Sequence, residues 1–314
     1  MGRERDSVGS FAVLSLGIIG STVLGVAARI WWPQAAQSGS DRTIAVSLWV
    51  ILPPCVFVNV AHFDLASGAG AGLALGLASL AAGGILAWYL AVRVARLPDR
   101  TAGASICAAI IANTGYYGLP ATLILFGSDA VTRAAAWDAI LTGPVTFVAG
   151  FAVGAVFGRD GGGEPDAGAR LRSFFTRNPV LWVLVPALLT PASAIPDWAL
   201  DASHLAFTVL LPVGFLVLGV NLYEPGGFAH VRSLAVPVAI GTAVRLLLVP
   251  ALYLGLCAAV GGIPGSYVIQ AAAPTGISAL IVAATFDLDR QVTAATIAAT
   301  TGLAVLGVLL SGAL

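Results

Sequence analysis

Lysine is missing from this sequence, and charge of either sign is scarce. All 15 basic residues are arginine, the acidic residues also number 15, and charged residues make up only 10% of the 314 positions. Schiff-base chemistry needs a lysine amine, so retinal pumps and pyridoxal enzymes are excluded, as are P-loop nucleotidases, whose motif contains lysine. The net charge of zero also provides no basic surface for a nucleic acid.

Cysteine is equally sparse. Cys55, Cys107 and Cys257 lie in apolar runs at long spacings, which fit neither a zinc site nor a disulfide framework. The motifs H-E-x-x-H and G-x-S-x-G do not occur, and no nucleophile stands with a base or metal set. We therefore expect neither an enzyme nor a bound metal or cofactor.

Apolar sequence is what the chain has in abundance. Hydrophobic residues make up 58% of it and the mean hydropathy is +0.94, values that leave too few polar residues to cover a soluble domain. Because a helix needs about 20 apolar residues to cross a membrane, we predict an all-α integral membrane protein with ten spans. They are Phe11–Trp31, Thr43–His62, Gly70–Val94, Ala102–Phe126, Val131–Val156, Pro179–Ile195, Leu205–Leu222, Leu234–Val260, Tyr267–Thr285 and Val292–Leu314. Arg3 and Arg5 before an apolar run also occur in signal peptides, but the length of the run and Trp31-Trp32 favour a retained helix.

The longest polar gap, residues 158–178, divides the chain into a five-span half, residues 1–157, and a second five-span half, residues 179–314. If the gap is a cytoplasmic linker, alternation of the spans puts eleven arginines on that side, namely Arg29, Arg42, Arg93, Arg96, Arg100, Arg159, Arg170, Arg172, Arg177, Arg232 and Arg290. The other side keeps three, Arg3, Arg5 and Arg133. The positive-inside rule then places both termini outside the cell membrane. An odd number of spans per half gives the halves opposite orientations, as in the inverted repeats of secondary transporters.

Two of the predicted spans are interrupted near their middle. Residues 113–120, Asn-Thr-Gly-Tyr-Tyr-Gly-Leu-Pro, weaken the fourth span, and residues 273–278, Ala-Pro-Thr-Gly-Ile-Ser, weaken the ninth. Thr114-Gly115 and Thr275-Gly276 are separated by 161 residues, so the interruptions occupy matching places in the two halves. Such paired breaks indicate a transporter's binding site, because the freed N–H ends of half-helices attract an anion.

These segments resemble the auxin efflux carrier family, which belongs with the bile acid, arsenite and riboflavin transporters. The resemblance is carried by residues 113–120 with Phe126-Gly127, by Ala271–Pro274 with Phe286-Asp287, by Leu52–Phe57 and Leu211–Leu216, and by Arg245 with Pro250. It runs in order along nearly the whole chain. The short linker departs from the plant carriers, and Tyr116-Tyr117 replaces the Phe and aliphatic residue of many relatives.

The resemblance implies ten helices in two inverted five-helix repeats, with spans 4 and 9 crossing at the substrate. Spans 1, 2, 6 and 7 would form a dimerising scaffold, and spans 3–5 and 8–10 a transport domain that moves like an elevator. Family members export auxin or move small organic acids such as malate and malonate. The implied partners are a small organic anion, the lipid bilayer and a second copy of the chain.

We expect the substrate to be held by residues of the two breaks and by polar residues that face them. These are Asn113, Thr114, Gly115, Tyr116, Gln270, Pro274, Thr275 and Gly276, with Asn59 and Asn221 contributed by the scaffold. Pro120 and Pro274 are expected to keep the two helices broken.

Two ionisable residues lie inside predicted spans, where they are costly. Asp138 could take a coupling proton, help to bind sodium, form a salt bridge, or be a carboxylate near the membrane interface. Arg245 could neutralise the substrate, pair with Asp138, or cap the carbonyls of a broken helix, and the structural role is favoured. Asp287, Asp289 and Arg290 are expected to be solvated on a cytoplasmic turn.

The sequence thus predicts a secondary carrier of a small organic anion. A sodium-coupled symporter of the bile-acid type and a non-transporting receptor on a carrier fold stay open as alternatives. Transport that depends on sodium would identify the symporter, and tight binding without flux would identify the receptor.

Overall fold

The computed structural model describes residues 2–62, 70–158, 167–224, 231–261 and 264–310, and within these ranges it is built from helices without a strand. The helices are α1 (Gly2–Trp31), α2 (Pro33–Val46), α3 (Leu52–His62), α5 (Ala71–Trp88), α6 (Asp99–Ile110), α7 (Leu119–Phe126), α8 (Ser128–Trp137), α9 (Phe151–Phe157), α10 (Ala167–Thr176), α11 (Pro179–Leu189), α12 (Asp197–Leu222), α13 (Val231–Ala243), α14 (Val249–Val260), α15 (Gly265–Ala271), α16 (Ser278–Thr285) and α17 (Arg290–Leu310). Short helical turns join several of these into longer runs: η1 (Ser47–Ile51), η2 (Tyr89–Val94), η3 (Thr114–Gly118), η4 (Asp138–Thr142), η5 (Val145–Gly150), η6 (Ala192–Ala194) and η8 (Val244–Leu248).

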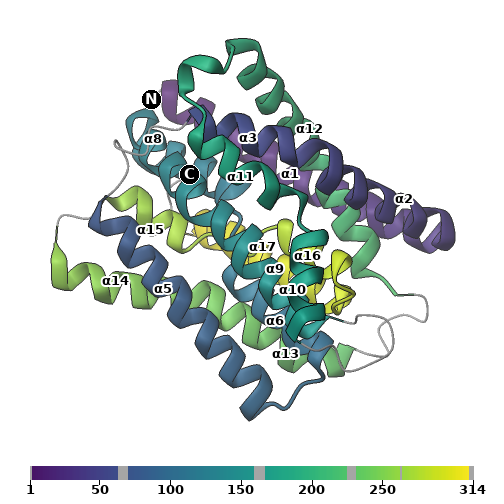
Figure 1. Ribbon diagram of the computed structural model, residues 1–314. Helices are drawn as coiled ribbons and strands as arrows, with labels where there is room; N and C mark the ends of the chain where they lie inside the picture. Colours follow the sequence, from purple (N-terminus) through teal and green to yellow (C-terminus); the bar gives the residue numbers. More distant parts are fainter. Residues whose placement is uncertain (1, 63–69, 159–166, 225–230, 262–263, 311–314) are drawn as a thin grey trace.

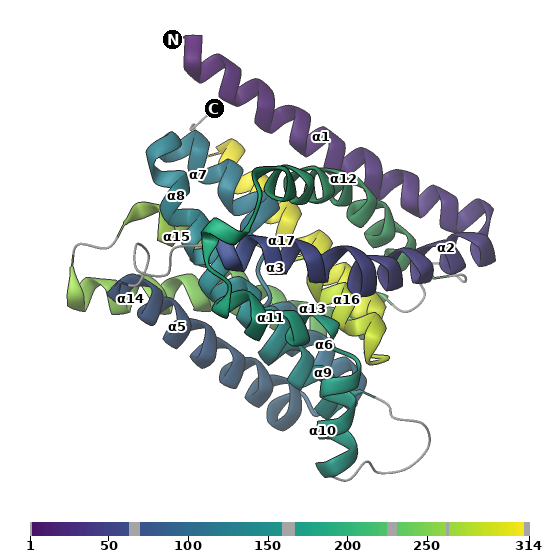
Figure 2. The same ribbon diagram turned by 45° about the horizontal axis from the view of Figure 1, so that its top comes forward.

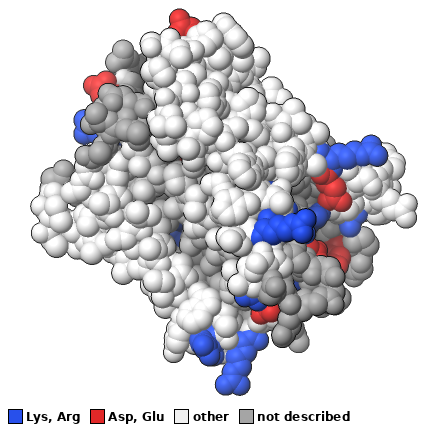
Figure 3. Space-filling view, in the orientation of Figure 1, with Lys and Arg blue, Asp and Glu red and all other residues white. Residues whose placement is uncertain are grey.

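Five helical runs in this part of the chain are long and apolar enough to cross a membrane. They are Pro33–His62, Ala71–Val94, Ser128–Phe157, Asp197–Leu222 and Ser233–Val260, and Ser15–Trp31 and Pro179–Leu189 are shorter apolar helices. Large apolar side chains such as Leu189, Trp182 and Ile85 stand on the outer surface. Figure 3 shows a broad uncharged face, with charged side chains gathered mostly where α2, α10 and the end of α5 lie in Figure 1. These features confirm an α-helical membrane protein.

Most of the helices pack in two groups, which contact each other along α12 and α17. In the first, α1 lies along α12, and α3 packs against both α11 and α12 (Figures 1 and 2). Gly25 and Gly219 allow the contact between α1 and α12, because a Cβ on Gly25 would stand 2.1 Å from the Leu216 carbonyl oxygen. The second group holds α5, α6, α13, α14 and α17, with α8, α9 and α15 packed on its members. The segment that follows α6 and the segment that follows α15 cross each other within the second group.

The ends of several elements differ from those predicted. Helix α2 begins at Pro33, ten residues before the expected Thr43, because proline is favoured in the first turn of a helix. Helix α11 ends at Leu189 and not at Ile195, since Pro191 cannot continue it. The expected linker, residues 158–178, contains α10, an amphipathic helix with Ser173 buried. Its residues 159–166 lie outside the described part.

Candidate functional site: two broken helices that cross

The two predicted breaks meet. Helix α6 ends at Ile110, the chain is not helical at Ile111–Asn113, and Ala112 forms an isolated antiparallel bridge with Thr275. The Asn113 amide donates to the Pro274 carbonyl at 2.7 Å, and the Gly276 amide donates to the Ile111 carbonyl at 2.9 Å. A Cβ on Gly276 would lie 2.7 Å from the Ala112 oxygen, so glycine permits this approach. Two segments 161 residues apart thus satisfy each other's backbone hydrogen-bonding groups inside the helix bundle.

The two prolines contribute differently. Pro274 lies in the second break and supplies the carbonyl that Asn113 binds. Pro120 does not lie in the first break: the chain is already helical from Thr114, and Pro120 is in the first turn of α7. Proline at this position removes one backbone donor from the helical run but leaves the run helical. The expectation that Pro120 breaks the helix is wrong, and the non-helical residues 111–113 make the interruption.

Asn113 stands at the N-terminal end of the helix that resumes after the first break. Its side-chain Oδ1 accepts from the Tyr116 amide at 3.2 Å and caps the turn 114–118. The side chain is 4% exposed, and its Nδ2 has no hydrogen-bond partner in the described residues. A buried donor without an acceptor costs about 1–3 kcal/mol, and an acceptor within reach of this amide would remove that cost.

Thr114 connects the first break to the helical run Ser128–Phe157. Its hydroxyl donates to the Asp138 carboxylate and is hydrogen-bonded to the Thr142 hydroxyl at 2.8 Å. Gly115 lies beside the same carboxylate, since a Cβ there would be 3.8 Å from both of its oxygens. Asp138 therefore lies at the first break, next to residues expected to hold the substrate. Thr142, which the sequence reasoning missed, stands one helical turn after Asp138.

Tyr116 turns toward the first packing group. Its ring makes an edge-on contact with Phe207 of α12, with 6.4 Å between ring centroids. Asn59 lies nearby on α3 and donates to Ser203, which is one helical turn from Phe207 on α12. Asn59 also donates to the Cys55 carbonyl. The structure thus brings Asn59 to the same end of α12 as Tyr116, where it joins two helices.

The second break is held by threonines. The Thr275 amide donates to the Thr300 hydroxyl at 3.1 Å, and the Thr275 hydroxyl donates to the Ala108 carbonyl at 2.8 Å. Thr275 is fully buried, and Pro274 and Gly276 are buried beside it. These bonds fix the second break to α6 and α17, leaving its threonine side chain without spare capacity.

Gln270 is on the last turn of α15 and is fully buried. Its Nε2 donates to the Thr122 hydroxyl at 3.2 Å, and its Oε1 has no partner in the described part of the chain. Gly118 makes room for it, because a Cβ at that position would lie 2.1 Å from Oε1. Gln270 therefore packs against the turn that follows the first break.

Arg245 is fully buried in the turn 244–248 and donates to the Ala271 carbonyl at the end of α15. A cation at a helix C-terminus compensates the negative end of the helix dipole. This geometry is the capping of a broken helix, one of the roles expected. An ion pair with Asp138 is not formed by these two described side chains.

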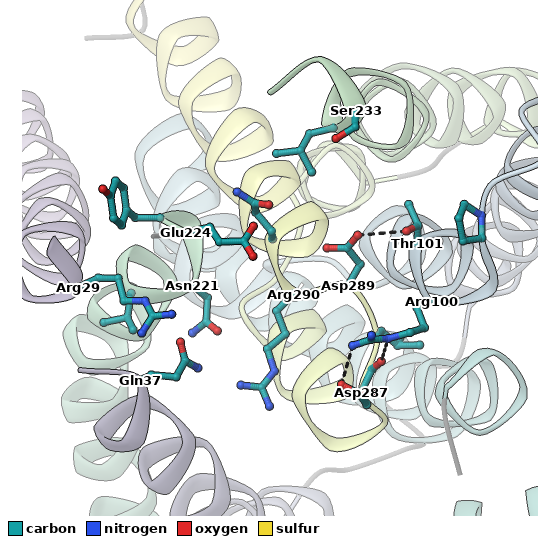
Figure 4. Close-up of a pocket in the computed structure, with 16 residues that line it drawn as sticks. Arg29, Gln37, Arg100, Thr101, Asn221, Glu224, Ser233, Asp287, Asp289 and Arg290 are labelled. Carbon is teal, nitrogen blue, oxygen red and sulfur yellow. Dashed lines mark hydrogen bonds and ion pairs between the residues drawn. The ribbon is translucent and has the colours of Figure 1, made fainter. Parts of the chain in front are cut away.

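Asn221 is not brought to the crossover. It donates to Ser40 on α2, and it is 14 residues beyond Phe207 on α12, about 21 Å along the helix axis. Instead it lines a polar pocket of about 570 Å³ between the two packing groups (Figure 4). The residues that line this pocket include none of those at the crossing.

The polar pocket is also lined by Asp287, Asp289 and Arg290, which were expected to be solvated on a turn. Figure 4 shows Arg100 bonded to Asp287, at 2.6 Å, and Thr101 bonded to Asp289. Arg290 pairs with Asp41 on α2, and so connects α17 to the first packing group. These side chains are partly exposed but bonded. The described residues hold no group of three or more His, Cys, Asp or Glu side chains suited to a metal.

Comparison with known proteins agrees with the architecture. Residues 179–311 match the model of a family described as membrane transport protein. That family contains the auxin efflux carriers, and it is a family of transporters and not of enzymes. A search of curated proteins finds no match for the chain.

Proposed function

We propose that this chain, whose residues 179–311 match the model of the membrane transport protein family, is a secondary active carrier of a small organic anion. The substrate would be a carboxylate of the auxin, malate or malonate kind. In this proposal it occupies the crossing of the two broken helices. Ten helices in two inverted repeats would carry the site through the cell membrane, with both termini outside.

One observation carries the proposal: a buried, unpartnered amide donor next to two helices that interrupt each other. Asn113 Nδ2 lacks an acceptor where the chain between α6 and α7 is unwound. An anion supplies acceptors and is also favoured by the N-terminal ends of resumed helices. We assign the binding role to Asn113, Thr114, Gly115 and Tyr116, with Gln270 and the second break as the opposite wall.

The division of the helices into two packing groups supports an elevator mechanism. The crossing lies within the group of α5, α6, α13, α14 and α17, so a ligand bound there would travel with that group. The other group, α1, α2, α3, α11 and α12, would be the scaffold and the dimer interface. Tyr116 against Phe207 and Arg290 against Asp41 are contacts that such a movement must break.

The test is transport by the purified protein in proteoliposomes. Acetate, lactate, malonate, malate and indole acetate are applied as separate probes, with and without sodium, and current and labelled uptake are recorded. We expect a saturable signal for one class of carboxylate that is lost in Asn113→Ala. Tight binding without flux would establish a receptor, and silence from folded protein towards every probe would overturn an anion carrier.

A further inference from the structure

Asp138 is an acidic side chain within an apolar helical run, and no ion pair joins it to a basic side chain of the described residues. It lies in Ser128–Phe157, one of the runs long enough to cross a membrane. The ion pairs within the described ranges are Arg100 with Asp287 and Arg290 with Asp41. An uncompensated carboxylate at such a place is costly, so its presence needs a ligand that removes the charge.

Among the described residues, the elements packed around Asp138 contain one cation, Arg133, whose side chain is exposed. The turn 138–142 packs against α8, α5, η3 and η5. Helix α5 and η5 contain no titratable residue, η3 contributes Tyr116 and Tyr117, and α15, which packs on α8, contributes Tyr267. On its own run, Asp129 and Arg133 are exposed near the start of α8. The nearest groups are therefore hydroxyls, which cannot neutralise a carboxylate.

We infer that Asp138 is the site of a coupling proton, so that the carrier moves its anion together with H⁺. The inference rests on the proposed function. A proton from the solution on one side of the membrane adds to the Asp138 carboxylate, giving a neutral carboxylic acid, and the same proton leaves on the other side. No bond of the substrate is made or broken, and no oxidant or reductant takes part.

Thr114 transmits the change of charge to the substrate site. While Asp138 is ionised, the Thr114 hydroxyl donates to it. Once Asp138 is protonated, its own O–H donates, and the Thr114 hydroxyl is released to bond an anion beside Asn113 Nδ2. Protonation also removes the negative charge that an incoming anion would meet. Binding of proton and anion is thereby mutually favourable, which is the requirement for symport.

The local chemistry favours a proton over a metal cation. Hard cations such as calcium and magnesium take about six or more oxygen ligands in proteins. In the described part of the chain, the side chain hydrogen-bonded to Asp138 is that of Thr114, which is in turn hydrogen-bonded to Thr142. A proton needs one carboxylate oxygen, and the row of hydroxyls provides a path for it.

Infrared difference spectroscopy of the reconstituted protein tests the proton site without any substrate. Acidification should produce the high-frequency carbonyl band of a carboxylic acid in an apolar environment. We expect this band to be lost in Asp138→Asn and kept in Asp129→Asn, a matched control on the exposed start of the same helical run. Thr114→Val should shift the band. If Asp138→Asn folds poorly, this variant still tests whether the band comes from Asp138. A band that persists in Asp138→Asn, or one that sodium removes at constant pH, overturns the inference.

Coupling is tested with malonate and malate as probes and a pH-sensitive dye inside the vesicles. We expect entry of the anion to acidify the interior, at a rate that falls to that of protein-free vesicles in Asp138→Asn and stays unchanged in Asp129→Asn. If the natural protein admits the anion without a proton, the inference of proton coupling is overturned but the proposed carrier function is not. If neither anion moves but the infrared band behaves as expected, the proposed function fails and the proton site stands.

Discussion

The two broken helices are related by sequence position but differ in how their polar groups are used. At the second break, Thr275 is fully buried and both its amide and its hydroxyl are bonded, to Thr300 and Ala108. At the first break, Asn113 keeps an unpartnered amide donor and Thr114 is bonded to an acidic side chain. The second break is therefore a fixed support, and in our proposal the first carries the groups that respond to a ligand.

This difference leads us to expect different responses to substitution at the two breaks. A support whose hydrogen bonds are internal tolerates little substitution, because any loss leaves buried groups unsatisfied. If the proposed function holds, a change at the break with an unpartnered donor should weaken ligand binding more than it weakens the fold. Variants at the two breaks should therefore fail in different ways.

The largest effect is expected for Asn113→Ala. A hydrogen bond to a charged group contributes about 1.5–3 kcal/mol, so the rate of anion transport at low concentration should fall by about 10- to 100-fold. The folded protein should persist, since only the cap to the Tyr116 amide is lost, at about 1 kcal/mol. Uptake in proteoliposomes and thermal unfolding in detergent measure the two quantities.

The control for Asn113→Ala is Gln34→Ala, which removes an exposed amide on α2. It should transport at the natural rate. Equal transport by Asn113→Ala and Gln34→Ala would remove Asn113 from the site.

The second break is tested by Thr275→Val. The change keeps the shape but leaves the buried Ala108 carbonyl without its donor, at a cost of about 1–3 kcal/mol. We expect a lower temperature of thermal unfolding, with Thr275→Ser restoring most of it because the hydroxyl is kept. A valine variant as stable as the natural protein would show that the second break is not the fixed support.

Gly118→Ala tests the contact between the two breaks. The added Cβ would displace Gln270 from Thr122, with an expected loss of about 1 kcal/mol in the free energy of unfolding. Gly302→Ala is the matched control, because open space surrounds Gly302 on α17 and alanine favours a helix. Gln270→Ala in the Gly118→Ala background should remove the clash, so the two changes should be non-additive. Additive losses of unfolding free energy would show that Gly118→Ala does not act through its contact with Gln270.

Much of this arrangement was predictable from the sequence, for reasons that can be identified. Apolar runs and the constant offset between Thr114 and Thr275 depend on local composition and on the repeat, and the antiparallel bridge at Ala112 agrees with the predicted crossing. The membrane assignment followed from composition alone. These features do not need knowledge of how individual side chains pair.

The remaining features depend on three-dimensional relations that spacing does not encode. Asn221 occupies the place in the second half of the chain that Asn59 occupies in the first. It nevertheless lies about 21 Å along α12 from Phe207, the residue that contacts Tyr116. Arg290 and Asp41 are 249 residues apart, so their pairing is invisible in one sequence. Pro120 was misassigned because the helix resumes before it and the non-helical residues precede it.

The smallest effect is expected for the ion pair between Arg290 and Asp41. Both side chains are partly exposed, 29% and 47%, and such pairs contribute about 0–1 kcal/mol. Arg290→Gln should therefore leave the unfolding temperature nearly unchanged, and added salt should reduce what difference there is. If the pair joins a moving group to a scaffold, the variant should still change the accessibility of a cysteine introduced at Gln291, in the polar pocket, to a water-soluble thiol reagent. Identical labelling rates with Arg290 and with glutamine would show that this contact does not hold the two groups together, and would leave Tyr116 against Phe207 as the contact to test next.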